Sequence, residues 1–170
     1  METSQRVLEL VTVAQANAKI SEGRILDILK LMDGQNGSDA QVEELRAATV
    51  LLELEVVDIF SLFEARMQHH FKRGPFSRKL KSLLLESQQT DLADKFYQYY
   101  LAINVLKHGK GASYRELLNV PNSLFVVKSN EDIIIDEEHP STGLVDLSVP
   151  GFFDGLIKTI LEAYHFLENR

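Results

Sequence analysis

The feature that most constrains this fold is a long, regular recurrence of apolar residues in the first half of the chain. From residue 42 to residue 67, every third or fourth position is apolar except for Thr49. The members are Val42, Leu45, Leu52, Val56, Ile59, Phe63 and Met67. Such spacing places all of them on one face of an α-helix. A second stripe of Val50, Leu54, Val57 and Phe60 widens that face. We predict a helix packed on two sides in a bundle, or one shared between the bundle and a dimer interface.

Comparable spacing predicts further helices along the chain. They cover residues 3–33, 76–87 and 90–108, then one or two turns over 113–118, and a last helix that ends near 168. Turn-forming residues separate them, including the cluster at 33–38, Gly74-Pro75 and Gly109. Ser38 or Asp39 is the expected cap of the helix that contains the long stripe.

The region before the last helix has a different composition. Residues 124–127 and 133–135 are rich in β-branched side chains and flank a polar segment, a pattern typical of a β-hairpin. We therefore predict a mainly α protein, a four- to five-helix bundle with a small β-hairpin insertion before the C-terminal helix. Residues 1–170 form a single domain in this prediction, with 121–148 as the hairpin and loop insertion.

Composition restricts the possible classes of protein. The 170 residues include 45% hydrophobic residues and no cysteine, so a core can form but disulfides and thiolate chemistry cannot. The longest apolar run, residues 99–103, is far too short to span a bilayer. No secretory signal precedes the first helix. We expect a cytoplasmic protein without a membrane segment.

Charge is distributed unevenly along the chain. The formal net charge is −7, which argues against broad nucleic-acid binding. From residue 66 to residue 115, however, there are ten Lys and Arg against three Asp and Glu, a balance of +7. This segment either faces an anion or is neutralised by acidic neighbours in the fold.

A polar constellation stands at the expected end of the helix over 90–108. Asn104 and His108 are four residues apart and share one helix face. The negative end of the helix dipole favours a protonated His108, which suits a general acid or a cation beside a phosphate. Asn104 could orient the ring or donate to an oxyanion. Alternatively, His108 only caps the helix and Asn104 contacts a neighbouring helix.

A helix that ends in Asn-x-x-x-His before a glycine-rich loop resembles the HEPN superfamily (higher eukaryotes and prokaryotes nucleotide-binding). The family motif is an Arg, then four to six residues, then a His, often with a polar residue directly after the Arg. Asn104 matches the polar position and His108 matches the His. The Arg is missing, because the positions that the spacing allows hold Leu101, Ala102 and Ile103.

The resemblance implies an all-α, usually dimeric protein. Many members are metal-independent endoribonucleases of toxin–antitoxin, phage-defence or RNA-processing systems. It implies catalytic roles for His108 and Asn104 here, a homodimer, and RNA, a nucleotide or an antitoxin as partner. Other residues could contact phosphate or a base: Lys107, Lys110, Ser113, Arg73, Arg78, Arg115 and Tyr97. Without the Arg, the protein is either an endoribonuclease that uses another cation or a degenerate relative. The competing hypothesis is a non-enzymatic interaction module that binds a partner helix through the stripe of residues 42–67.

Three other patterns carry less chemistry. The adjacent His69 and His70 would point about 100° apart on an α-helix, unlike a chelating pair four residues apart. The loop from Gly109 to Ser113 lacks the spacing of a nucleotide-triphosphate loop. The acidic stretch at 132–139 has no ligand pattern for a divalent cation. We predict neither a metal nor a cofactor.

Overall fold

A computed structural model describes residues 2–33, 36–121, 123–129, 142–149 and 151–170. The described chain is mainly helical. Its elements are α1 (Glu2–Met32), α2 (Asp39–Met67), the short 3-10 helix η1 (Gln68–His70), α3 (Phe76–Glu86), α4 (Thr90–His108), α5 (Ala112–Leu118) and α6 (Phe152–Glu168). The predicted helical bundle is therefore confirmed.

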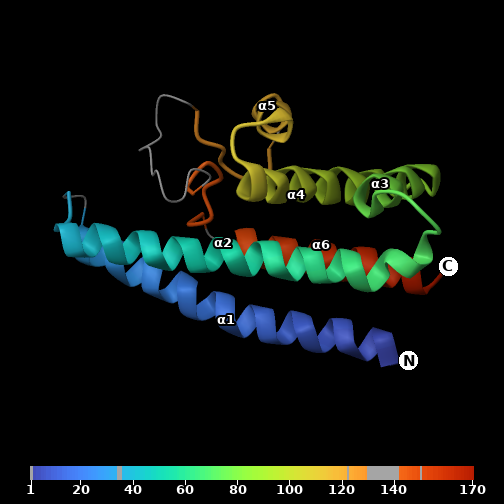
Figure 1. Cartoon of the computed structure of the whole chain (residues 1–170), viewed down its shortest axis with the longest axis horizontal. Helices are drawn as coiled ribbons and strands as arrows, with labels where there is room; N and C mark the ends of the chain where they lie inside the picture. Colours follow the sequence, from blue (N-terminus) through green and yellow to red (C-terminus); the bar gives the residue numbers. More distant parts are fainter. Residues whose placement is uncertain (1, 34–35, 122, 130–141, 150) are drawn as a thin grey trace.

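Four long helices build the bundle, and two short ones cover one of its sides. Figure 1 shows α1 and α2 as a long antiparallel pair, with α6 at the level of α2 and α4 on the opposite side from α1. The helix α4 contacts α2, α6, α3 and α5, whereas α1 contacts only α2 and α6 extensively. Consequently α3, α4 and α5 form the side of the bundle that faces away from α1.

The apolar stripe of α2 lies in the core from Leu52 onward, whereas Val42 at its start is 40% exposed. Leu52, Val56, Ile59, Phe63 and Met67 are each at most 3% exposed. The rings of Phe60 and Phe63 contact Phe96 of α4, with centroids 5.5 and 6.3 Å apart. This stripe packs inside its own chain, so it is not a surface that can receive a partner helix. Leu54, placed in the second stripe, is instead 53% exposed on the outer side of α2.

The start of α2 follows the predicted signal. Ser38 is its N-cap, because the Ser38 hydroxyl accepts a hydrogen bond from the Gln41 backbone N–H at 3.2 Å. In return, the Gln41 side-chain oxygen accepts one from the Ser38 N–H at 2.9 Å. Two backbone donors at the helix start are thus satisfied.

The predicted β-hairpin is not seen in the residues that the structure describes. Among them, pairing is limited to one antiparallel bridge, between Val127 and Val145, and no strand forms. Backbone hydrogen bonds of 2.8 Å on each side join Lys128 to Leu144 and Asp146 to Val126. The predicted second strand, 133–135, and the acidic stretch at 132–139 lie outside the described residues.

Side chains of the bundle form hydrogen bonds with the backbone of the described parts of the insertion. Gln98, only 1% exposed, accepts a hydrogen bond from the Leu124 N–H at 3.0 Å. Tyr114 donates to the Lys128 carbonyl at 2.5 Å, and Glu53 accepts from the Gly143 N–H at 3.0 Å. Backbone groups that a sheet would satisfy are therefore satisfied by α2, α4 and α5.

Candidate functional site

The glycine after α4 ends the helix as predicted. Gly109 has a φ of 71°, and its N–H donates to the Val105 carbonyl at 2.8 Å. Glycine adopts a positive φ without the clash that a Cβ causes. The next helix, α5, begins at Ala112, so the C-terminal end of α4 and the start of α5 lie beside one another (Figure 1).

Asn104 joins these two helices. It is half-buried, and its side-chain amide donates a hydrogen bond to the Ser113 hydroxyl at 3.3 Å. The structure thus brings two of the predicted site residues together. His108 is exposed, and no hydrogen bond or ion pair links it to any residue in the described part of the chain. Of the alternatives for Asn104, the contact with a neighbouring helix is the one observed.

The missing motif arginine has no substitute at its own positions. Leu101 and Ile103 are 1% exposed and Ala102 is fully buried. All three belong to the core cluster, so these positions face the interior of the bundle. A phosphate near His108 would have to be neutralised by cations that come from elsewhere on the surface.

Tyr97 connects α3, α4 and α5. Its hydroxyl donates to a Glu116 carboxylate oxygen at 2.6 Å, its ring stacks on Tyr100 at 5.8 Å, and the Lys81 ammonium lies 3.4 Å from its ring centroid. Burial and the Glu116 carboxylate raise the pKa of Tyr97 to about 12, against an opposing effect of Arg78. With Lys81 and Tyr100 on its ring, Tyr97 is better suited to positioning Lys81 than to stacking on a base.

The basic segment is exposed and lacks ion-pair partners. Arg73, Arg78, Lys107, Lys110 and Arg115 are all exposed. Within the described ranges, none of the Lys and Arg from residue 72 to residue 115 lies within salt-bridge distance of a carboxylate. Neutralisation by acidic neighbours, one of two predicted arrangements, is therefore not what the described residues show.

The elements that carry these cations, α3, α4, α5 and the turns beside them, lie on the side of the bundle that faces away from α1 (Figure 1), and we call these residues the band of cations. Arg78 lies close enough to Tyr97 to affect its titration. Lys107 stands about 15 Å further along α4, since a helix rises about 1.5 Å per residue, and Lys110 lies in the turn that follows. Arg78 and Lys79 line an open hollow of about 360 Å³ together with Phe71, Ser82, Leu83 and Glu86. The band suits an extended anion better than a single phosphate.

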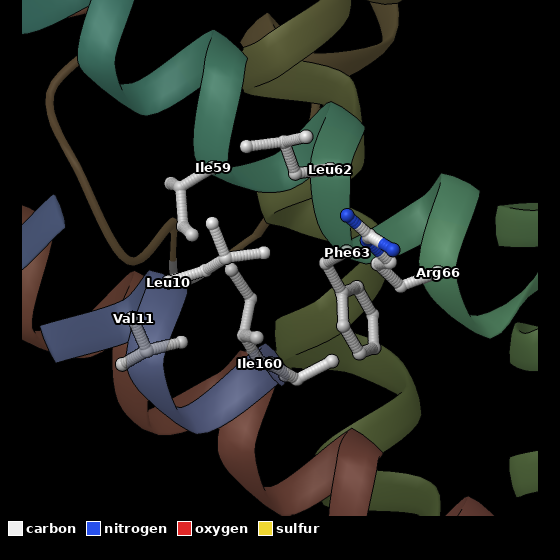
Figure 2. Close-up of a pocket in the computed structure, with 8 residues that line it drawn as sticks. Leu10, Val11, Ile59, Leu62, Phe63, Arg66 and Ile160 are labelled. Carbon is white, nitrogen blue, oxygen red and sulfur yellow. The ribbon is translucent and has the colours of Figure 1, made fainter. Parts of the chain in front are cut away.

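A second concave region is purely structural. Figure 2 shows apolar side chains of α1, α2 and α6, including Leu10, Ile59 and Ile160, that converge with Arg66 at the edge. The space between them has no room for a water molecule. This region is packed core, not a ligand site.

Sequence reasoning missed one cluster of possible ligands. His69 and His70 have ring centroids 4.2 Å apart, and His70 Nε2 lies 3.1 Å from a carboxylate oxygen of Glu168. The histidine pair was visible in the sequence, but Glu168 is 98 positions away. No local signal could have joined them.

No family model matches this chain, and searches of curated proteins and of solved structures find no match either. The HEPN resemblance therefore rests on Asn104, His108 and the glycine-rich loop alone. Among the described helices, none combines the length and the apolar character needed to cross a bilayer.

Proposed function

We propose that this chain is a HEPN-like helical protein that binds RNA or a nucleotide phosphate through the band of cations on α3, α4 and α5, without cleaving it. The observation that carries the proposal is the exposure of Arg78, Lys107, Lys110 and Arg115 without ion-pair partners among the described residues. Unpaired cations on one side of an otherwise acidic protein attract an anion to that side and repel it elsewhere.

The chemistry of the band favours binding over catalysis. Lys and Arg neutralise phosphates, and this term supplies most of the affinity for a polyanion. Cleavage through the RNA 2′-hydroxyl also needs a group that removes a proton and one that donates it. His108 is an exposed histidine at the end of α4, and Asn104 is engaged with Ser113. We therefore assign His108 to phosphate contact.

Charge reversal at the end of α4 tests this proposal. Lys107→Glu combined with Lys110→Glu should weaken binding of a labelled single-stranded RNA of about 12 nucleotides by at least about tenfold. The slope of log affinity against log salt should fall by about 1.4, since each lost phosphate contact on a single strand contributes about 0.7. Fluorescence anisotropy at several salt concentrations measures both quantities.

A matched control separates a local contact from net charge. Lys19→Glu combined with Lys158→Glu makes the same charge change on exposed positions of α1 and α6. It should leave the RNA affinity within about twofold of the wild type. An equal loss in both double variants, or no saturable binding by the wild type, would overturn the proposal. Shortened RNA after incubation with the wild type would contradict the absence of cleavage.

A second candidate function, an interaction module, is favoured by the outer face of α1. Val13, Ile20 and Leu31 are 60%, 66% and 74% exposed. They lie on the helix face opposite the buried positions Val11 and Ala18. Large apolar side chains exposed along one helix face are typical of a surface that associates with another protein.

A second copy of the chain suits this face. In an antiparallel pairing that places Val13 against Ile20 of the second copy, Glu9 meets Arg24, which also lies 3.4 Å from Glu44 of its own chain, and Arg6 meets Asp27. Each contact occurs twice, as two-fold symmetry requires. Opposite charges on both sides of an apolar centre would fix this register. This is a route to the homodimer that the HEPN resemblance implies.

Ile20→Asp should therefore shift the protein from dimer to monomer at micromolar concentration, because a charge at the centre of an apolar interface is left unpaired. Sedimentation velocity measures the change. Leu54→Asp, on the exposed side of α2, is the matched control and should not alter the assembly state. A wild type that sediments as a monomer would refute self-association through α1.

A further inference from the structure

Three possible metal ligands meet where η1 approaches the end of α6. One ligand atom from each of His69, His70 and Glu168 lies within 4.8 Å of the others. We propose that these residues bind a divalent transition-metal ion, with Zn²⁺ as the best fit. The site lies at η1 and the end of α6, and it does not depend on the proposed RNA binding.

The distances suit a small ion. His70 Nε2 and the Glu168 carboxylate oxygen are 3.1 Å apart. Zinc bonds to nitrogen and oxygen are about 2.0–2.2 Å long, so two ligands of a tetrahedral site stand about 3.3 Å apart. This pair is thus already near the spacing that a shared zinc requires. The His69 ligand atom lies within 4.8 Å of the other two, so it is the one that would need to move closer.

The hydrogen bond of His69 prepares its ring for a metal. Its Nδ1 lies 2.8 Å from the Arg66 carbonyl oxygen, which can only accept. Nδ1 therefore carries the proton, and Nε2 keeps a free lone pair. Histidines that bind metals commonly donate their other ring N–H to a backbone carbonyl, which fixes the ring and increases its basicity.

The kind of ligand selects the class of metal. Two imidazoles and one carboxylate favour Zn²⁺ and its first-row neighbours, whereas Mg²⁺ and Ca²⁺ prefer oxygen ligands. The side chains of His70 and Glu168 are 20% and 33% exposed, so solvent can reach the ion. Three protein ligands leave one tetrahedral position for water.

The 100° separation expected for His69 and His70 does not apply, because the two residues do not lie in an α-helix. Gln68–His70 is a 3-10 turn, and Phe71 follows in an extended conformation. The rings come to 4.2 Å from one another there. The 100° separation of adjacent α-helical residues thus does not exclude a shared ion at this position.

A bound ion would join two distant segments of the bundle. His70 ends the segment that continues α2, and Glu168 is the last residue of α6. An ion that binds the folded but not the unfolded chain stabilises the fold in proportion to its occupancy. We therefore expect Zn²⁺ to raise the melting temperature of the whole domain.

Calorimetric titration of the untagged protein with ZnCl₂ tests the site. The wild type should bind one Zn²⁺ per chain and melt at a higher temperature with zinc than without. His70→Gln and Glu168→Gln should each weaken binding at least about tenfold and abolish the thermal shift, because loss of one ligand opens a three-ligand site. MgCl₂ should produce neither effect.

His165→Gln is the matched control, because His165 is an exposed histidine of α6 that lies outside the cluster. It should bind Zn²⁺ as the wild type does. Wild-type affinity in His70→Gln or Glu168→Gln would overturn the proposal, as would the absence of zinc binding by the wild type. Circular dichroism of each variant verifies the helical fold, so a lost site is distinguished from a lost structure.

Discussion

Phe96→Ala is expected to lower the free energy of unfolding by about 3–5 kcal/mol. Phe96 is fully buried on α4, and its ring stacks on Phe60 at 5.5 Å and meets the edge of Phe63 at 6.3 Å. Truncation removes the apolar area of the ring and leaves a cavity that the two α2 phenylalanines cannot fill without moving. Domains of this size are stable by about 5–15 kcal/mol, so the variant loses a large share of its stability.

Urea unfolding followed by circular dichroism measures this loss, since the chain contains no tryptophan to serve as a probe. Leu54→Ala is the control, because Leu54 is 53% exposed on α2 and its truncation should change stability by less than about 0.5 kcal/mol. A loss below about 1 kcal/mol for Phe96→Ala would mean that α2 and α4 do not pack through these rings.

The helices could be predicted because their signals are local. The stripe from Val42 to Met67 follows the helix period, and Ser38 and Gly109 supply a start and an end at the positions observed. The burial of Ile59 and Phe63 also follows from that period. The period alone does not say what covers a helix face, so it leaves both a core and a dimer interface possible. The contacts of α4 and α6 with α2 place this face in the core.

The β-hairpin is not seen among the described residues, and strand pairing is not a local property. Residues 124–127 have the composition of a strand, but Val127 pairs with Val145. Two side chains from helices earlier in the chain bond to the backbone there. Gln98 accepts a hydrogen bond from the Leu124 N–H, and Tyr114 donates one to the Lys128 carbonyl. Propensity identifies residues that fit a sheet, whereas tertiary contacts decide whether a sheet forms.

The candidate site divides in the same way. Proximity of Asn104 to Ser113 follows from the glycine-bounded turn between α4 and α5, which the sequence shows. The contact of Lys81 with Tyr97 depends on how α3 packs on α4, and the sequence contains no signal for it. The approach of Glu168 to His70 likewise requires the whole bundle to be folded.

The deep burial of Tyr99 should make this fold sensitive to alkaline pH. Tyr99 is 4% exposed on α4, and its ring contacts Phe125 and Phe152 with centroid distances of 5.3 and 5.5 Å. Burial raises the pKa of Tyr99 to about 12, from 10.0 for a solvated tyrosine. The folded state thus favours the protonated phenol, because a phenolate among these rings would lose its hydration.

The sign of the pH dependence follows from that shift. The pKa is higher in the folded state, so the contribution of Tyr99 to stability is complete below about pH 10 and is lost as the pH rises toward about 12. One pKa unit corresponds to 1.36 kcal/mol, which makes the loss about 2–3 kcal/mol over this window. The pKa of Tyr97 is raised in the same direction, so its ionisation adds to the loss.

Tyr99→Phe should remove the part of this alkaline destabilisation that Tyr99 contributes, about 2–3 kcal/mol, and leave the part that Tyr97 contributes. At neutral pH the variant should lose at most about 1 kcal/mol, because the hydroxyl makes only a long hydrogen bond of 3.4 Å to the Phe152 carbonyl. Urea unfolding of the wild type, Tyr99→Phe and Tyr97→Phe at intervals between about pH 8 and pH 11.5 provides the comparison. Parallel stability curves for the wild type and Tyr99→Phe would show that the Tyr99 phenol ionises without opposing the fold. The ring of Tyr99 would then not be packed closely against Phe125 and Phe152.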